Sequence, residues 1–266
     1  MQRYFDRTID GAPPGPVERD EVYRRLAFPR GVDDPVRRPY TAINMVSTVD
    51  GKVVVGGPGS TRLIGSDTDH ALMGRIELQA DSVLMGAGLA REDDPPYPRL
   101  DAPRQRQREL MGLRSQPLWA IVSGSAQFPH LPRLLKDGGP SNAAVFTTDR
   151  VSSGRREELS QFARVYVCGR DAVDVLQMGA ILRDELGVAS TICIGGPTLN
   201  AALVRAGVAD EMFVTLAPKI QGGSRVPTAI EGQGYPAEGL PVLDLLSLYG
   251  DGDELYLRYR LPAQGR

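Results

Sequence analysis

The stretch that decides the fold is TICIGGPTLNAALVRA, residues 191–206. A short apolar run comes first, and Gly195-Gly196-Pro197 follows it. Proline suits the first turn of a helix, because its ring fixes φ and that position needs no N–H donor. The stretch therefore predicts a buried strand, a tight glycine turn, and a helix that runs to Arg205 and is stopped by Gly207.

The same alternation of strand and helix extends along the chain. Apolar runs predict strands at 40–46, 82–88, 118–124, 143–148, 164–169, 190–194 and 211–218, with further β character at 52–55. Helices are expected at 66–80, 104–112, 152–162 and 173–186. Residues 245–261 predict a hairpin that turns at 250–253. Parallel strands need crossover helices, so we expect an α/β fold with a mixed, mainly parallel central sheet and a C-terminal antiparallel hairpin.

The first 38 residues differ from the rest. They are rich in Pro, Arg and Asp and show little periodicity, which predicts an N-terminal extension on the surface with one short helix near 17–26. Residues 40–262 contain neither an internal repeat nor a linker, and residues 39–266 are expected to form a single domain.

Composition limits the partners and the location. The 266 residues contain 31 Lys+Arg and 33 Asp+Glu, which gives no bulk charge for nucleic acid or an anionic membrane. The apolar stretches fall short of the ~20 residues needed to span a bilayer, and the start lacks the apolar run of a secretory signal. Two cysteines suit a reducing compartment, so we expect a cytoplasmic protein.

The chain contains few of the Cys and His residues that commonly bind transition metals. With only Cys168, Cys193, His70 and His130, the chain lacks the residues for a multi-cysteine site or a site made mainly of His and Cys. We expect no metal, and a carboxylate-bound ion is the alternative that the sequence leaves open. The motif pair of a zinc deaminase is also missing. Both cysteines end β runs and are interpreted as small buried hydrophobes.

Two glycine clusters fall where strands end. In open sheets of this kind, ligands bind beyond the carboxyl ends of the strands. The Gly195-Gly196-Pro197-Thr198 turn would let a backbone approach a pyrophosphate at a helix start, or it is an ordinary strand-to-helix turn. Gly86-x-Gly88 is only half of a dinucleotide-binding motif. Asp50-Gly51-Lys52 and Asp93-Asp94-Pro95 are first of all turn sequences.

Taken in order, several motifs resemble one family. They are RPYTAINMVSTVDGKV (38–53), ADSVLMGAG (80–88), EDDP (92–95), IGGPTLNAALVRAGVADEMFVTLAPKIQGG (194–223) and VPTAIEGQG (226–234). The resemblance is to the riboflavin-biosynthesis pyrimidine reductases, which have a dihydrofolate-reductase-like fold. Such reductases are free-standing or form the C-terminal half of a deaminase–reductase. The last two motifs look closest to the free-standing archaeal and fungal type.

The resemblance implies a homodimeric, NADPH-dependent oxidoreductase. Its substrate would be a ribosylamino-pyrimidinone 5′-phosphate, as in a 5-amino-6-(5-phosphoribosylamino)uracil reductase, with hydride passing to the sugar C1′. By position, the residues implied to bind the cofactor are Ser47, Thr48, Gly86, Asp93, Ser123, Gly195, Gly196, Pro197, Thr198, Leu199 and Asn200. The residues implied to bind the substrate are Asp50, Arg99 and the position of Ile194. The resemblance assigns no acid or base, so the catalytic residues stay open, as does the role of Lys219.

Three residues depart from the family pattern. Glu77 replaces an arginine on the substrate side, Leu89 replaces a threonine that touches the cofactor, and Ile194 replaces an acidic residue that holds the substrate. An isoleucine accepts no hydrogen bond, so we expect the substrate to be held less well there. Two alternatives therefore remain: an NADPH-dependent reductase of the same fold with a pterin- or folate-like substrate, and a non-catalytic nucleotide-binding relative.

Overall fold

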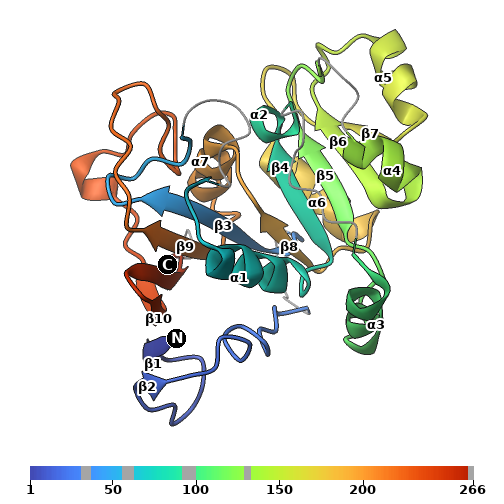
Figure 1. Cartoon of the computed structure of the whole chain (residues 1–266). Coiled ribbons are helices and arrows are strands. Elements are labelled where there is room, and N and C mark those ends of the chain that lie inside the picture. The colour runs from blue at the N-terminus through green and yellow to red at the C-terminus, as the bar shows by residue number, and fades with distance from the viewer. Residues whose placement is uncertain (31–36, 56–62, 92–99, 129–132, 263–266) are drawn as a thin grey trace.

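The computed structural model describes residues 1–30, 37–55, 63–91, 100–128 and 133–262. Its centre is one eleven-stranded sheet in the order β2-β1-β10-β11-β9-β3-β8-β4-β5-β6-β7 (Figure 1). The strands are β1 (Gln2–Asp6), β2 (Gly15–Pro16), β3 (Tyr40–Thr48), β4 (Ser82–Gly86), β5 (Leu118–Val122), β6 (Ala143–Thr147), β7 (Arg164–Val167), β8 (Ser190–Cys193), β9 (Glu211–Ala217), β10 (Asp244–Asp251) and β11 (Glu254–Arg260). The strands from β9 to β7 in that order are parallel, and β11, β10, β1 and β2 add antiparallel pairs at one edge. The predicted fold class is confirmed.

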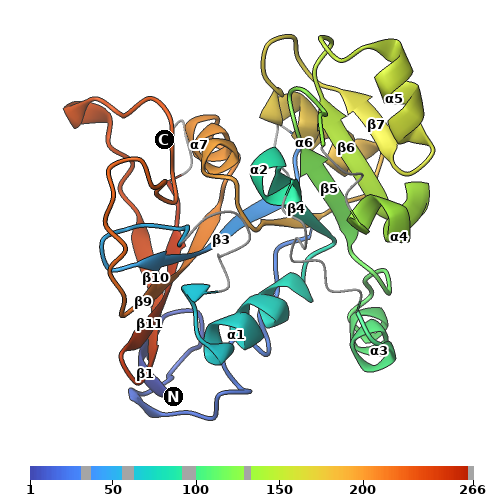
Figure 2. The ribbon, with the colours of Figure 1, turned by 45° about the horizontal axis from the view of Figure 1, so that its top comes forward.

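Helices cover both faces of the parallel part (Figure 2). They are α1 (Asp67–Glu77), α2 (Ala87–Ala90), α3 (Ala102–Leu110), α4 (Arg133–Asn142), α5 (Ser153–Ser160), α6 (Val175–Asp184) and α7 (Pro197–Arg205), with a 3₁₀ turn η2 (Ala237–Gly239). One core cluster joins α1, α2, α4 and α5 to the sheet through residues such as Leu72, Ala90 and Leu159. The second joins α6 and α7 to the opposite face through Met178 and Leu203. All side chains of β4, β5 and β6 are buried, as expected for strands covered on both sides.

Most predicted elements are present, but the N-terminal segment differs from its prediction. Residues 19–25 form turns rather than a helix, and Tyr23 has a φ of 58°. Val22, Tyr23 and Leu26 lie in the core, and the Tyr23 ring meets the edge of Phe213 with centroids 5.3 Å apart. The segment also pairs β1 with β10. The helix prediction at 17–26 was wrong, because packing against the sheet decides this segment and its own periodicity does not.

Two further local predictions differ from the structure. Residues 52–55 do not form a strand; Lys52 makes only an isolated bridge to Thr228. The helical stretch α4 was not predicted, since it contains Gly139, with a φ of 62°, and Pro140. Both features interrupt the pattern that signals a helix in a sequence.

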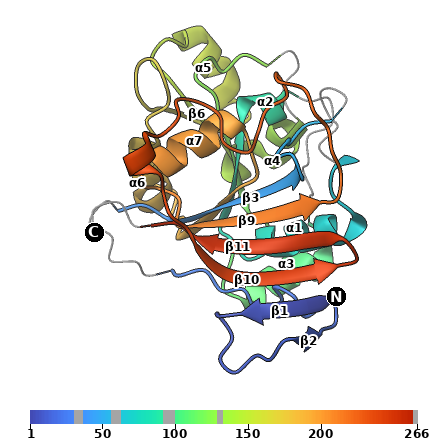
Figure 3. The same cartoon turned by 90° about the vertical axis from the view of Figure 1, so that its left-hand side faces the viewer.

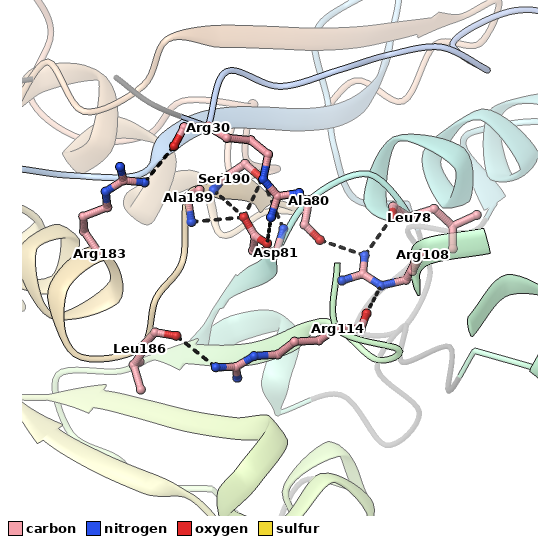
Figure 4. Close-up of polar contacts among 10 residues, drawn as sticks. All are labelled: Arg30, Leu78, Ala80, Asp81, Arg108, Arg114, Arg183, Leu186, Ala189 and Ser190. Carbon is pink, nitrogen blue, oxygen red and sulfur yellow. Dashed lines mark hydrogen bonds and ion pairs between the residues drawn. The ribbon is translucent and has the colours of Figure 1, made fainter. Parts of the chain in front are cut away.

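The amino ends of the central strands are closed by polar contacts (Figure 4). Asp81 accepts hydrogen bonds from the Ala189 and Ser190 N–H groups and pairs with Arg30 at 2.8 Å. Arg108 on α3 is fully buried and donates to the carbonyls of Leu78 and Ala80, both at 2.7 Å. This network holds the starts of β4 and β8 together and leaves the carboxyl ends free for a site.

Candidate active site

The position of β8 creates a place for a ligand. β8 lies between β3 and β4, and the chain continues from it into α7 on one face of the sheet. The chain leaves β4 through α2 on the other face. Where neighbouring parallel strands send their helices to opposite faces, a crevice forms at the carboxyl ends. The two glycine clusters of the sequence lie at this point.

The two glycine turns touch each other through backbone atoms alone. The Gly86 N–H donates to the Gly195 carbonyl at 2.8 Å. A Cβ added to Gly196 would lie 2.9 Å from the Gly86 Cα, and one added to Gly86 would lie 3.0 Å from the Gly196 Cα. Gly195 and Gly196 also have φ values of 127° and 101°, which other residues rarely adopt. Only glycines allow this contact, and we call the paired turns of Gly86 and Gly195-Gly196 the cradle.

The cradle leads directly into the start of α7. Pro197 is the first residue of this nine-residue helix, and the preceding Gly196 supplies no side-chain cap. The first turn therefore keeps N–H groups that an anion could bind, supported by the helix dipole. Thr198 is exposed here and adds a hydroxyl. A backbone cradle beside an uncapped helix start fits the pyrophosphate of a dinucleotide.

Two residues of the predicted cofactor set have a structural role in this turn. Leu199 is buried in the core, and Asn200 is fully buried. The Asn200 side chain donates to the Ala229 carbonyl at 2.9 Å, and its oxygen lies 3.2 Å from the Cys193 sulfur. Burial raises the pKa of the Cys193 thiol to about 12, which agrees with its interpretation as a small hydrophobe. Asn200 thus ties a later loop to the start of α7.

The end of β3 brings a second group to the same edge. The Thr48 hydroxyl accepts from the Lys52 N–H at 2.9 Å and donates to Asp50 at 2.6 Å. Asp50 also accepts from the N–H groups of Gln221 and Gly222, at 3.1 and 2.7 Å. These three donors, with the Thr48 hydroxyl first, lower the pKa of Asp50 to about 2. Asp50 is therefore an ionised group that fastens the loop after β9 to the turn after β3.

Two other predicted residues lie close to strand ends. Ser47 is buried at the end of β3. Ser123 follows β5 and is buried, and its hydroxyl accepts from the Ala126 N–H at 3.1 Å. The predicted residues Asp93 and Arg99 lie outside the described residues.

The three departures from the family pattern fall in different places. Ile194 is buried beside the cradle, on the face that carries α1 and α2, and its N–H donates to the Leu84 carbonyl at 3.0 Å. Leu89 lies on α2 and packs against the same core cluster. Glu77 ends α1, only a few residues before β4 begins, so it belongs to the amino end of the sheet. Of the three, Ile194 and Leu89 can influence a ligand in the crevice.

Two contacts at this edge were not expected from the sequence. Lys219 donates through Nζ to the carbonyls of Leu63 and Ile64, both at 2.8 Å, so it supports the segment before α1. The Met45 sulfur would lie 3.5 Å from a Cβ added to Gly195, and it forms one wall of the cradle. Neither residue type signals such a position in a sequence, because both contacts join distant parts of the chain.

Comparison with known proteins places this geometry in a family. The RibD C-terminal domain matches residues 39–257, and the chain belongs to that family. A 2,5-diamino-6-ribosylamino-4(3H)-pyrimidinone 5′-phosphate reductase of Methanothermobacter thermautotrophicus is 28% identical over 229 residues, which are 85% of this chain and 100% of that protein. The reductase of the same name from Archaeoglobus fulgidus is 26% identical, over 74% of this chain and 89% of its own length.

A solved structure shows the same fold. The pyrimidine reductase-like protein of Corynebacterium diphtheriae superposes with a TM-score of 0.71 at 17% identity, covering 90% of this chain and 98% of its own. Among the described residues, no helix is both long and apolar enough to cross a membrane.

Proposed function

We propose that this protein is an NADPH-dependent reductase of riboflavin biosynthesis that transfers hydride to the ribose C1′ of a ribosylamino-pyrimidinone 5′-phosphate. The observation that carries the proposal is the side-chain-free contact of Gly86 with Gly195-Gly196 at the start of α7. The names of the archaeal relatives support the choice of substrate. Two free, buried cysteines are in keeping with a cytoplasmic location.

The chain's own contribution is position and electrostatics. The glycine turn and the α7 N–H groups would hold the pyrophosphate of the cofactor. Thr48 and Asp50 keep the end of β3 in place beside it through the bonds described above. When bound, the reduced nicotinamide supplies a hydride to C1′ of the open-chain imine, and with one proton this converts the C=N bond into CH₂–NH.

The test is an assay with purified protein and NADPH. Loss of the absorbance of the reduced nicotinamide is followed with the 2,5-diamino pyrimidinone phosphate, its deaminated uracil counterpart, and a dihydropterin. We expect NADPH to be oxidised in the presence of a ribosylamino-pyrimidine phosphate and not in the presence of the pterin. Turnover of the pterin alone would move the protein to another substrate class, and no turnover with cofactor still bound would indicate a non-catalytic relative.

We propose further that the protein is a homodimer. Along β9, β11 and β10, alternate side chains are buried on the side that carries α1 and Tyr23, and the others form a half-exposed apolar face. This outer face consists of Val214, Leu216, Leu245, Leu248, Leu255, Leu257 and Tyr259. Figure 3 shows that side of the three strands with no helix in front of it. A contiguous apolar surface of this kind is typical of an interface, and two-fold dimers are the most common assembly.

We also propose that residues 39–266 form the reductase domain and that residues 1–38 are an extension that packs against it. Two hydrogen bonds join this extension to α1 and to the residues that directly follow it. Arg75 donates to the Arg19 carbonyl at 2.8 Å, and Gln79 donates to the Tyr23 carbonyl at 2.7 Å.

A further inference from the structure

The motif VPTAIEGQG, at 226–234, lies in the long connection between β9 and β10. This connection passes α7 in Figure 3, and we call its residues 226–235 the brace. The brace contacts the turn after β3 on one side and α7 on the other. It therefore links two parts of the site that are far apart in the chain.

The first end of the brace is fastened to the turn that follows β3. The Val53 N–H donates to the Pro227 carbonyl at 3.1 Å, and Lys52 forms the isolated antiparallel bridge with Thr228. The Lys52 N–H also donates to the Thr48 hydroxyl at 2.9 Å. The brace thus reaches the end of β3 through a single residue.

The second end of the brace is fastened to α7. The Glu231 N–H donates at 3.1 Å to the carbonyl of Pro197, which is the first residue of that helix. The fully buried Asn200 side chain donates to the Ala229 carbonyl at 2.9 Å. The guanidinium group of the last α7 residue lies 4.7 Å from the centroid of the Tyr235 ring. The brace therefore contacts both the first and the last turn of α7.

One carboxylate closes the turn between these two ends. Glu231 Oε1 accepts from the Thr228 N–H at 2.6 Å and from the Thr228 hydroxyl at 3.0 Å. These two bonds, the backbone N–H first, lower the pKa of Glu231, so the group is ionised at neutral pH. Hydrogen bonds to an ionised acceptor are stronger than those between neutral groups. The turn 228–231 carries both the bridge to Lys52 and the donor to Pro197.

The sheet does not make the same connection. The ladder between β3 and β8 ends at the pair Ile43 and Cys193. The turn after β3 and the start of α7 both come later in their segments, so this ladder does not tie them to each other. The brace spans that gap with hydrogen bonds on both sides.

We infer that Glu231 is a positioning residue, which keeps the end of β3 and the start of α7 at the separation that a bound dinucleotide spans. The inference rests on the proposed function, which supplies the cofactor and places its pyrophosphate on the cradle. The nicotinamide then lies at the β3 end, beside Ser47 and Thr48. Hydride transfer needs the reacting atoms at close range and in line, so a fixed separation of the two ends favours the reaction.

The test compares the wild type with Glu231→Ala, Glu231→Gln and Thr228→Val. Glu238→Ala is the matched control, because Glu238 is exposed in the same connection. Calorimetry gives the Kd of NADPH and of 2′-phospho-ADP-ribose, which lacks the nicotinamide. Assays with the pyrimidine phosphate give kcat and the primary isotope effect of NADPH with deuterium at the transferred position.

The expected result is a loss that only the whole cofactor shows. Glu231→Ala should lower kcat about 10-fold and weaken NADPH about 10-fold, with a larger isotope effect, since hydride transfer then limits the rate more. Binding of 2′-phospho-ADP-ribose should stay within about two-fold of the wild type, because it does not reach the β3 end. Glu231→Gln keeps two acceptor bonds and should restore most of the activity. Thr228→Val should lie between, and Glu238→Ala should match the wild type.

Other outcomes overturn the inference, each for its own reason. A lower melting temperature of Glu231→Ala with unchanged kcat and unchanged binding would show a merely structural role. Equal weakening of NADPH and 2′-phospho-ADP-ribose would mean that the carboxylate acts on α7 alone. If Glu231→Ala does not fold, a Thr228→Val variant with the kcat of the wild type rejects the inference. A wild type that binds no NADPH, or binds it without turnover, rejects the proposed function itself.

Discussion

Asp69, in the first turn of α1, is a buried carboxyl group. It is 1% exposed, and neither oxygen has a hydrogen-bond partner at ordinary geometry among the described residues. Burial raises its pKa from 3.8 to about 6; the Thr215 hydroxyl and His70 oppose this rise, and the charge of Glu254 adds to it. The folded protein then binds this proton more tightly than the unfolded chain does. The contribution of Asp69 to stability should fall as the pH rises from about 4 to about 6, by about 3 kcal/mol in all, and stay level above that.

The corresponding prediction concerns Asp69→Asn, which keeps the shape and removes the titration. The free energy of unfolding of the variant, minus that of the wild type, should increase between pH 4 and pH 7 by up to about 3 kcal/mol. Urea unfolding at several pH values measures this difference. Asp67→Asn is the control, because Asp67 is exposed in the same helical turn. A constant difference for Asp69→Asn would mean that its carboxyl titrates normally.

At the scale of elements, the site depends on two strand-to-helix turns that meet through glycine. Gly196→Val should weaken NADPH binding by more than about 10-fold, since a Cβ there would lie 2.9 Å from the Gly86 Cα and force apart the two turns that would hold the pyrophosphate. Because valine at this position must adopt the positive φ of Gly196, the free energy of unfolding of the variant should also be lower by about 1–3 kcal/mol. Calorimetry with NADPH and a thermal melt measure the two effects separately.

The matched control for this turn is Gly88→Ala. An added Cβ at Gly88 meets nothing within 4 Å, and this glycine does not have a positive φ. It should bind NADPH as the wild type does. If a folded Gly196→Val variant kept its affinity, the turn before α7 would not be part of the cofactor site.

At the scale of the whole molecule, the outer face of β9, β10 and β11 should be covered by a second copy. Light scattering at micromolar concentration should give twice the mass of the chain. Leu257→Glu places a charge within that face and should give a monomer that still folds. Leu110→Glu is the control, because Leu110 is 89% exposed on α3, away from the face. A monomeric wild type would contradict the proposed dimer.

Sequence alone was sufficient wherever a feature is local. The strands that begin at 82 and 118, the helix start at Ser66 and the hairpin turn near Gly252 each depend on residues close together in the chain, although both strands end two residues earlier than predicted. The Gly195-Gly196-Pro197 turn was also predicted, because glycine and proline act on their own backbone. The motifs carried the family for the same reason, since each is a short run of residues.

Tertiary structure decided what depends on distant contacts. The sequence does not reveal that Gly86 supports Gly196, that Asp50 is engaged by the loop after β9, or that residues 22–28 enter the core. It likewise places Lys52 far from Thr228 in the chain, and the connection after β9 brings them together. The physical reason is that a residue's pattern reports its own backbone preference and polarity. Its contact partners are set by the order of the strands in the sheet, and here that order places β8 between β3 and β4.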